Sequence, residues 1–471
     1  MPLKKYYFQL KNKLYMEGGF SYANFTLLNG AFLIGFALAL GANNLELGII
    51  LAIPLFTNLL QLFSAFMLEV TGTKKKTAIL SLFFGRALWI LIVLMAFELF
   101  GNGKNIFLLM AILLLSSLFS SIGNLALLSW MKDIVPLERL ARFFGKRNMY
   151  ATASGIFAYL LGSYMLDKYR SLKTYGYLFF FALIFGLIAL LYLINIPDSR
   201  KKIKAISPKK FFERLSKPLN DKNFKQFLRF GLLWGFAINV ASPFFLVYML
   251  KDLSLGFFVV SLFLIIDALA RIYGLGVWRK IADSFGAKPL LVISTTVTSA
   301  VPLAFLFIDK GNYFLIMPIF IVAAISYASV DISLGQLLFK SAPKKYDAYY
   351  LAAFSSLTGL ASSFGPIFGG IIASLIGNGF SVNFFPPLKY VFLASFILRV
   401  MCIPLVSKLY EPEAKNVNDT LDRMKTLKTV SFFVSIYSFT SYASKIVLIP
   451  QKQFFILQRK LKKRKTKKMR V

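Results

Sequence analysis

Ionisable side chains inside apolar segments are the residues of this sequence most able to do chemistry. Asp267 and Arg271 lie four residues apart in the apolar run at about 255–278, and Asp331 lies in the run at about 313–338. Residues four apart share one face of a helix, so Asp267 and Arg271 are expected to form an ion pair within an apolar layer. Such a pair either switches when a substrate or a proton breaks it, or is self-neutralised and only joins helices.

Asp331 is the best single acid for proton coupling, and a structural contact with a loop lysine is an equally good explanation of it. A carboxylate in an apolar layer can serve as a proton relay. If a proton gradient drives this protein, Asp331→Asn should abolish its pH-driven activity.

Amides and hydroxyls form a second polar set within the apolar runs. Ser117, Ser121 and Asn124 recur at helical spacing on one face of a single run, and Asn29 and Asn239 lie near the middle of two others. These uncharged groups suit a polar neutral or zwitterionic solute, and the alternative is hydrogen bonding between helices.

The composition requires a membrane around these runs. The 471-residue chain is 57% hydrophobic and its mean hydropathy is +0.66, whereas globular domains are about 45–50% apolar. Histidine is absent and Cys402 is the single cysteine. This excludes histidine-ligated metal sites, histidine bases and an internal disulfide, so we expect no cofactor and no metal.

Twelve apolar runs, each long enough to cross a bilayer core about 30 Å thick, predict an all-α polytopic protein with two pseudo-symmetric six-helix bundles. The runs lie at about 18–41, 46–70, 77–99, 105–131, 149–167, 175–196, 230–250, 255–278, 289–308, 313–338, 349–377 and 388–407. The expected domains are an N-terminal half at 1–199, a central loop at 200–229, a C-terminal half at 230–408 and a tail at 409–471.

The net charge of +35 is explained by topology rather than by nucleic acid. With the N-terminus in the cytoplasm, the five cytoplasmic connections carry 25 Lys and Arg residues and the six outer connections carry 7. Positive residues concentrate on the cytoplasmic side of membrane proteins. We therefore expect a multi-pass protein of the cytoplasmic membrane with both termini in the cytoplasm.

Similar loop motifs follow the second helix of each half. They read Glu69-Val-Thr-Gly72-Thr-Lys74-Lys75 and Asp283-Ser-Phe-Gly286-Ala-Lys288. In each motif the acid can pair with a basic residue or cap a helix, and the glycine permits a tight turn between antiparallel helices.

Both motifs resemble the cytoplasmic loop motif of the major facilitator superfamily, in which Gly, Asp and Arg precede a Gly and two basic residues. The copies here are degraded, with Glu69 in place of Asp, and Val70 and Ser284 in place of Arg. The resemblance covers about 18–408 and implies two bundles that rock around a central cavity lined by helices 1, 4, 7 and 10. It assigns the following residues to that cavity: Asn29, Ser117, Ser121, Asn124, Asn239 and Asp331.

The loop at 132–148 is also similar to loops of that family. The resemblance implies that Arg139 or Arg142 pairs with Glu69 when the cytoplasmic side is closed, and the alternative is a solvated positive loop. The expected cytoplasmic gate comprises Glu69, Gly72, Arg139, Arg142, Asp283, Gly286 and Lys288. In helix 11, Gly365-Pro366 and Gly369-Gly370 resemble the family's bending motif, which exporters carry in helix 5 and which is absent there.

The tail contains a moderately apolar segment at 429–450 and a final block with nine Lys and Arg residues at 459–470. A thirteenth span would put this block outside the cell, so an interfacial helix anchored to anionic lipid headgroups fits better.

Together these patterns predict a transporter that moves a small solute across the membrane by alternating access, with proton coupling as one option. The expected partners are a small-molecule substrate and membrane lipid, with no nucleic acid, and the protein is expected to act as a monomer. No phosphate-cradling Gly-rich loop with a Lys is present. The alternative is a membrane-embedded enzyme or a non-transporting accessory protein.

Overall fold

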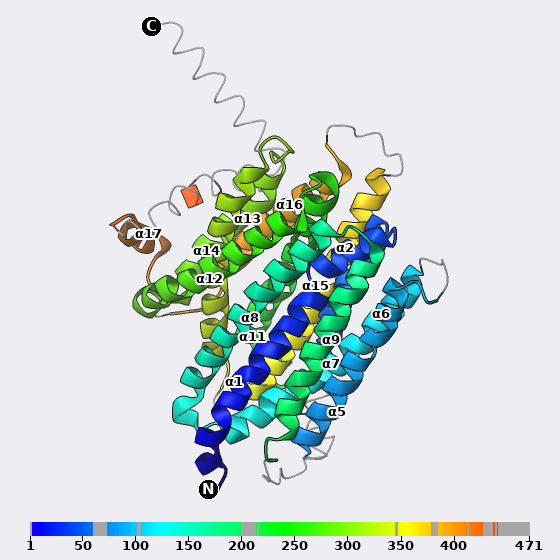
Figure 1. Cartoon of the computed structure of the whole chain (residues 1–471). Helices are drawn as coiled ribbons and strands as arrows, with labels where there is room; N and C mark the ends of the chain where they lie inside the picture. Colours follow the sequence, from blue (N-terminus) through cyan, green and yellow to red (C-terminus); the bar gives the residue numbers. More distant parts are fainter. Residues whose placement is uncertain are drawn as a thin grey trace, which may run out of the picture.

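The chain folds into helices. The computed structural model describes residues 2–59, 73–100, 105–198, 213, 216–343, 347–377, 385–412, 414–426, 437–438 and 440, and no strand occurs among them. The first half contains α1 (Pro2–Leu28), α2 (Ala31–Ala39), α3 (Asn44–Thr57), α5 (Lys74–Ala87), α6 (Trp89–Ala96), α7 (Ile106–Ile134), α8 (Leu140–Lys168) and α9 (Leu172–Ile194). The second contains α11 (Lys222–Val247), α12 (Phe257–Phe285), α13 (Ala287–Phe305), α14 (Ile316–Ser341), α15 (Asp347–Gly377) and α16 (Pro387–Ser407), followed by α17 (Val417–Thr426) (Figure 1).

Polar residues at the helix ends fix where several of these helices begin. Asn43 and Glu46 form a reciprocal capping box at the start of α3, Ser171 caps α9, and the Asp221 carboxylate accepts from two backbone N–H groups of α11. Gly30, at a φ of 61°, separates α1 from α2. Each cap satisfies N–H groups that a helix leaves unpaired.

Ten helical stretches in the described ranges are long and apolar enough to cross a membrane. The pairs α1–α2 and α5–α6 each form one of them. α3 and α8 correspond to the second and fifth of the twelve predicted membrane-spanning helices. Large apolar side chains face outward, with Phe107 exposed by 77% and Phe314 by 61%. So many exposed large apolar side chains on helices of this length require lipid around them, and the protein is a multi-pass membrane protein.

The packing of the two halves is pseudo-symmetric. In the first half α1 packs against α8 and α9, and α3 and α5 pack against α7. In the second half α11 packs against α15 and α16, and α12 and α13 pack against α14. The contacts between the halves follow the same pseudo-symmetry. α3 packs against α15, and the counterpart of α3 in the second half, α12, packs against α8, the counterpart of α15. The expectation of one six-helix fold built twice is confirmed.

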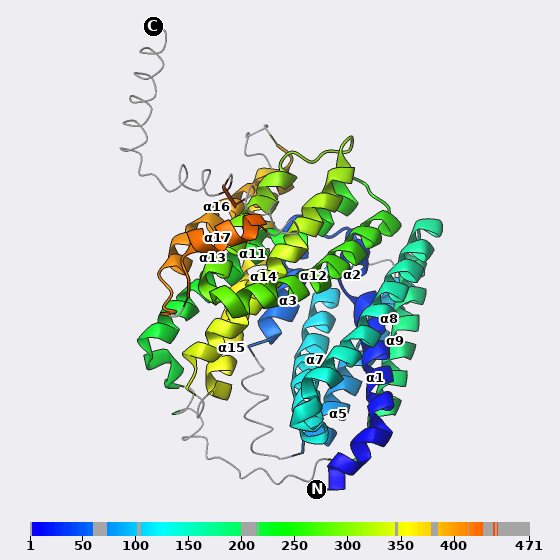
Figure 2. The same cartoon turned by 90° about the vertical axis from the view of Figure 1, so that its left-hand side faces the viewer.

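The halves are joined closely at one end. The end of the molecule that carries the N-terminus and the α7–α8 and α12–α13 connections is called the basic end. The end at which the two halves contact each other is called the opposite end. At the opposite end α3 and α15 touch backbone to backbone: a Cβ on Gly370 would lie 2.7 Å from the carbonyl oxygen of Asn44, and one on Gly48 would collide with the carbonyl oxygen of Pro366. Toward the basic end α7 and α8 diverge from α15 (Figure 2).

Two helices begin earlier than the apolar runs predicted, and this changes the site. α1 starts at Pro2 rather than near 18, and α8 starts at Leu140 rather than near 149. The apolar run marks the part of a helix in lipid, whereas the helix itself continues past the hydrocarbon boundary. Glu17 and Arg147, which the runs left outside the helices, therefore lie within α1 and α8.

Arg399 in α16 is a structural clamp. Its side chain is fully buried and donates to the backbone carbonyls of Thr298 and Ile238, to the Tyr327 hydroxyl and to Ser395 Oγ, at 2.9–3.3 Å. The partners come from α11, α13, α14 and α16 itself. A buried guanidinium with many acceptors holds these four of the six helices of the second half together.

The segment after α16 ties down the α12–α13 turn. The Glu411 carboxylate accepts from the backbone N–H groups of Ala287 and Lys288, at 3.2 and 2.6 Å, and from Lys340 Nζ at 2.6 Å. Gly286, at a φ of 90°, provides the turn, and a Cβ there would lie 3.0 Å from Ala414. The predicted tight turn at Gly286 is present, and the acid that caps the following helix is Glu411.

We expect Glu411→Gln to lower the free energy of unfolding at pH 7 by about 1–3 kcal/mol, the usual cost of losing hydrogen bonds to a charged group. Burial alone would raise the pKa of the Glu411 carboxyl, but the bonds from Lys340, Lys288 and Ala287 outweigh it and lower the pKa below its ordinary value of 4.5. A lowered pKa contributes stability that is present above pH 4.5 and is lost as the pH falls through the folded-state pKa.

Thermal melts of the purified protein check this prediction. The melting temperatures of wild type and Glu411→Gln should differ at pH 7 and converge well below pH 4.5. The exposed Glu138, at the same end of the molecule, provides the control: Glu138→Gln should follow wild type throughout. A difference between wild type and Glu411→Gln that grows on acidification would contradict the assignment.

Candidate functional site

The described residues enclose a cavity of about 1240 Å³ between the helices of the first half, with α12 on its far side. Gly145, Asn148 and Met149 line it near the basic end and are exposed to solvent. The cavity therefore opens toward the basic end, while the halves meet at the opposite end.

Polar groups of four helices line the cavity. Ser117 and Asn124 of α7 and Thr152 of α8 have no hydrogen-bond partner among the described residues, whereas Ser121 Oγ donates to the carbonyl of Thr57 in α3 at 3.1 Å. Asn29 of α1 donates to the carbonyl of Phe25, four residues earlier in its own helix, at 2.9 Å. The groups without partners are available to a solute.

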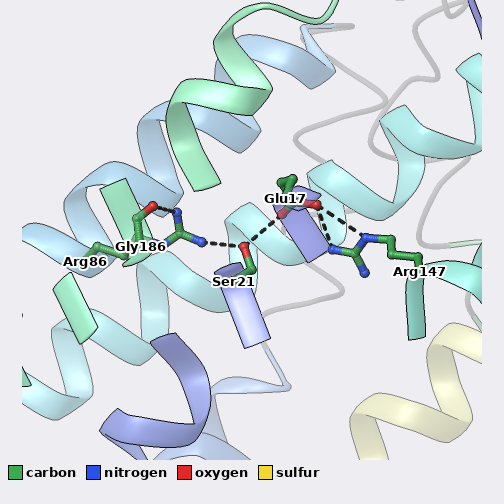
Figure 3. A network of polar contacts seen from close by, with 5 residues as sticks. All are labelled: Glu17, Ser21, Arg86, Arg147 and Gly186. Carbon is green, nitrogen blue, oxygen red and sulfur yellow. Dashed lines mark hydrogen bonds and ion pairs between the residues drawn. The ribbon is translucent and has the colours of Figure 1, made fainter. Parts of the chain in front are cut away.

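A charged network that crosses three helices is the main polar feature of the cavity wall (Figure 3). Glu17 Oε2 accepts from Arg147 Nη2 at 2.9 Å and Nε at 3.3 Å, and Glu17 Oε1 accepts from Ser21 Oγ at 2.8 Å. Arg86 Nη2 donates to Ser21 Oγ at 3.0 Å, and its Nη1 donates to the carbonyl of Gly186.

The members of this network differ in exposure. The Glu17 side chain is fully buried, whereas that of Arg147 is 19% exposed. Arg86, Arg147 and Ser21 line the cavity. A buried carboxylate held by one guanidinium and close to a second is the arrangement expected for an ionisable site within a membrane protein. The network links α1, α5 and α8, and through Gly186 it reaches α9.

The predicted cavity residues separate into two groups. The predicted residues Asn29, Ser117, Ser121 and Asn124 line the cavity. Asn239 does not: its amide donates to the carbonyl of Gly235 at 2.8 Å, and its backbone packs against Gly365 of α15. The lining thus comes mainly from the first half rather than equally from helices 1, 4, 7 and 10.

The predicted ion pair between Asp267 and Arg271 is corrected. Arg271 Nη2 bonds to Asp331 Oδ2 of α14 at 2.5 Å, and no ion pair within 4.0 Å joins Arg271 to Asp267. The long guanidinium side chain reaches across to the neighbouring helix rather than along its own. The Arg271 and Asp331 side chains are 42% and 50% exposed, and Asp331 is outside the described cavity lining.

The predicted gate residues that the structure describes lie at the basic end, where two other described residues form an ion pair. Lys74 Nζ pairs with Asp133 Oδ2 at 2.7 Å in the first half. Arg139, Arg142 and Asp283 are exposed. Lys288 takes part through its backbone N–H to Glu411. Glu69 and Gly72 lie outside the described residues, and so does most of the segment at 429–450.

A second inter-half contact closes the opposite end. The Asp167 carboxylate of α8 accepts from the backbone N–H groups of Phe257 and Phe258, at 2.8 and 2.9 Å, in the first turn of α12. Nearby, Lys251 Nζ donates to Asn44 Oδ1 at 3.3 Å. A carboxylate from one half thus caps a helix of the other, where the helix dipole favours negative charge.

Sequence reasoning missed Glu17, Arg147 and Asp167. Glu17 and Arg147 are 130 residues apart and lie at the edges of apolar runs, where a charge looks like a loop residue. The available signal was a single acid next to Gly18 and Gly19, at the start of the first run. The described residues contain no group of three or more His, Cys, Asp and Glu side chains that could hold a metal ion.

Comparisons with known proteins agree with this architecture. A family model described as Major Facilitator Superfamily matches residues 18–266 and 231–458. No curated protein matches the chain. Solved structures share its fold at low sequence identity, under 25%.

Three solved structures of transporters are similar to this chain. The nucleoside transporter NupG (D323A mutant) is 14% identical, with a TM-score of 0.68 over 85% of this chain and 100% of that one. The D-xylose-proton symporter is 15% identical, with a TM-score of 0.65 over 87% and 99%. A bacterial homologue of the human lysosomal transporter Spinster, inward-facing and occupied, is 13% identical, with a TM-score of 0.63 over 88% and 99%. The chain belongs to the major facilitator superfamily, whose members are transporters rather than enzymes.

Proposed function

We propose that this protein is a secondary active transporter that carries a small solute by alternating access to the first-half cavity. The observation that supports this most strongly is the cavity itself. It is lined by polar groups that have no partner among the described residues, it opens toward the basic end, and two pseudo-symmetric halves contact each other at the other end. Rocking the halves about this cavity would open the opposite end and close the basic end.

The charge count supports a basic end in the cytoplasm and a protein of the cytoplasmic membrane. Members of the family commonly work as monomers, and we propose the same here. The residues expected at the cytoplasmic gate remain a proposal for the other conformation, in which the basic end is closed. Of these, the Glu69 partner is expected to be Arg139 or Arg142.

We propose that Glu17, rather than Asp331, is the acid that couples transport to a proton. Glu17 is buried beside the cavity and bonds to residues of the cavity wall, whereas Asp331 pairs with Arg271 outside the described lining. A proton on Glu17 would release Arg147 and change the charge seen by the solute. Coupling of this kind is reciprocal, because the solute and the proton shift each other's binding.

Reconstitution tests the function as a whole. Purified protein is first screened by thermal melting against a panel of metabolites, since a ligand that binds the folded state stabilises it. Proteoliposomes are then loaded with the stabilising solute, and counterflow of the labelled solute is measured. Counterflow well above that of empty liposomes is the expected result. Binding without flux would identify a non-transporting receptor or accessory protein instead.

Asp167→Asn should weaken the closure of the opposite end. The asparagine keeps the shape but loses the charge at the start of α12, a change that costs about 1 kcal/mol, equivalent to about a fivefold shift between conformations. The reporter is Ser117→Cys in a Cys402→Ser background, in which it is the single cysteine. Its labelling by a membrane-impermeant maleimide from the opposite-end face should accelerate about fivefold.

Asp309 provides a matched control, because this acid is near the same end and pairs with Lys389 within the second half, at 2.7 Å. Asp309→Asn should leave the labelling rate unchanged. Equal acceleration by both substitutions would show a general loosening rather than loss of a gate contact.

A further inference from the structure

The described cavity wall carries an excess of positive charge. Arg86 and Arg147 both line the cavity, and no described lining residue is acidic. Glu17 is fully buried and bonds to Arg147, so it offsets one of the two guanidinium charges. The network of three ionisable groups keeps a net charge of one positive unit beside a cavity within the membrane.

Such a charge is costly unless a partner neutralises it. Removing a charge from water into a low-dielectric interior costs several kcal/mol, and only paired charges recover it. Arg86 is 8% exposed, and its described partners are a carbonyl and a hydroxyl. These neutral acceptors satisfy part of its hydrogen bonding but do not cancel its charge. No other described residue of the cavity wall supplies the remaining counter-charge, and an anion from the solution in the cavity would supply it.

Both guanidiniums retain N–H donors for an incoming group. Arg86 uses Nη1 and Nη2 toward Gly186 and Ser21, which leaves Nε and the second hydrogen of each terminal nitrogen. Arg147 uses Nε and Nη2 toward Glu17, which leaves Nη1. Guanidinium groups bind carboxylate and phosphate oxygens in this forked manner.

The rest of the wall suits the organic part of a solute. Ser117, Asn124 and Thr152 offer hydroxyl and amide groups without partners in the described chain, and Trp89 and Tyr22 offer aromatic surface. The cavity is larger than the roughly 300–1,000 Å³ typical of pockets that enclose a small ligand. It therefore admits a solute of metabolite size together with water.

We infer that the substrate is a small organic anion whose carboxylate or phosphate group binds between Arg86 and Arg147. Naming the anion as the substrate rests on the proposed transport function. The oxyanion site itself is inferred only from the charges of the cavity wall. It revises the expectation of a neutral or zwitterionic solute, which considered only the amides and hydroxyls.

Melting of the purified full-length protein tests the site with defined probes. Inorganic phosphate and sulfate are each compared with sodium chloride at equal ionic strength and pH. Either oxyanion at tens of millimolar should raise the melting temperature of wild type by about 2 °C or more relative to chloride. Arg147→Gln and Arg86→Gln should each abolish the difference, and Arg147→Lys should restore part of it.

The exposed Arg279 of α12 provides a control for loss of one positive charge, and Arg279→Gln should keep the full oxyanion effect. If Arg86→Gln does not fold, the responses of Arg147→Gln and Arg147→Lys to the oxyanions test the site on their own. The inference is overturned if neither oxyanion exceeds chloride on wild type, or if Arg147→Gln responds like Arg279→Gln. Counterflow with glycerol and glycerol 3-phosphate then separates the two proposals. Transport of glycerol but not of glycerol 3-phosphate would overturn the anion inference and support the transport function. Oxyanion binding without flux of any bound solute would support the oxyanion site and overturn the transport function.

Discussion

Glu17→Gln is expected to abolish uptake driven by a pH gradient while leaving solute counterflow in place. The substitution keeps the shape and a hydrogen-bond acceptor for Arg147, but the side chain can no longer bind and release a proton. Gradient-driven uptake should fall to the level of empty liposomes, a loss of about tenfold or more, because coupling requires an ionisable group in the transport path. Counterflow involves no net proton movement and needs only a working cavity.

Asp331→Asn is the natural comparison, since it neutralises an acid that pairs with Arg271 outside the described cavity lining. It should retain gradient-driven uptake. The opposite pattern, with uptake lost in Asp331→Asn and kept in Glu17→Gln, would indicate that Asp331 of α14 is the residue that couples transport to a proton. Loss of both uptake and counterflow in Glu17→Gln would indicate a structural role for the network.

Gly48→Leu is expected to hold the opposite end open and to stop transport. Gly48 of α3 touches the backbone of Pro366 and Gly370 of α15, where even a Cβ does not fit. Small residues at such positions let two helix backbones approach in a membrane. A leucine should therefore exclude the closed contact seen here and reduce counterflow to background, while the protein still folds in the opposite-open conformation.

Gly335 of α14 provides the matched control, because no atom lies within 4 Å of a Cβ placed there. Gly335→Leu should keep counterflow close to wild type. Both variants should elute as single symmetric peaks in size-exclusion chromatography. Normal counterflow in Gly48→Leu would mean that closure of the α3–α15 contact is not part of the transport cycle.

The sequence predicted the fold well because lipid imposes a simple pattern. Runs of apolar residues identified the helices, and the spacing of Ser117, Ser121 and Asn124 put these residues on one face of α7. The family resemblance assigned that face to the cavity, which all three residues line. Their common face follows from helical geometry alone, so no tertiary information was needed.

The charged network could not be predicted from the sequence, because it depends on contacts between distant residues and on where the helices begin. Glu17 and Arg147 fell outside the predicted helices, since hydropathy marks the lipid boundary and not the end of a helix. Arg271 was paired with Asp267 on spacing, but a long side chain selected Asp331 on the adjacent helix instead. Local periodicity fixes which face a residue occupies, whereas its partner depends on which helix lies against that face.

Labelling of Ser117→Cys from the two sides of the membrane tests alternating access most directly. In the Cys402→Ser background this cysteine is the sole thiol and lies in the cavity wall. A membrane-impermeant maleimide is added to right-side-out and inside-out vesicles. Alternating access predicts labelling from both faces, faster from the basic-end face in wild type and faster from the opposite face in Gly48→Leu. Labelling from one face alone, unchanged by Gly48→Leu, would contradict it.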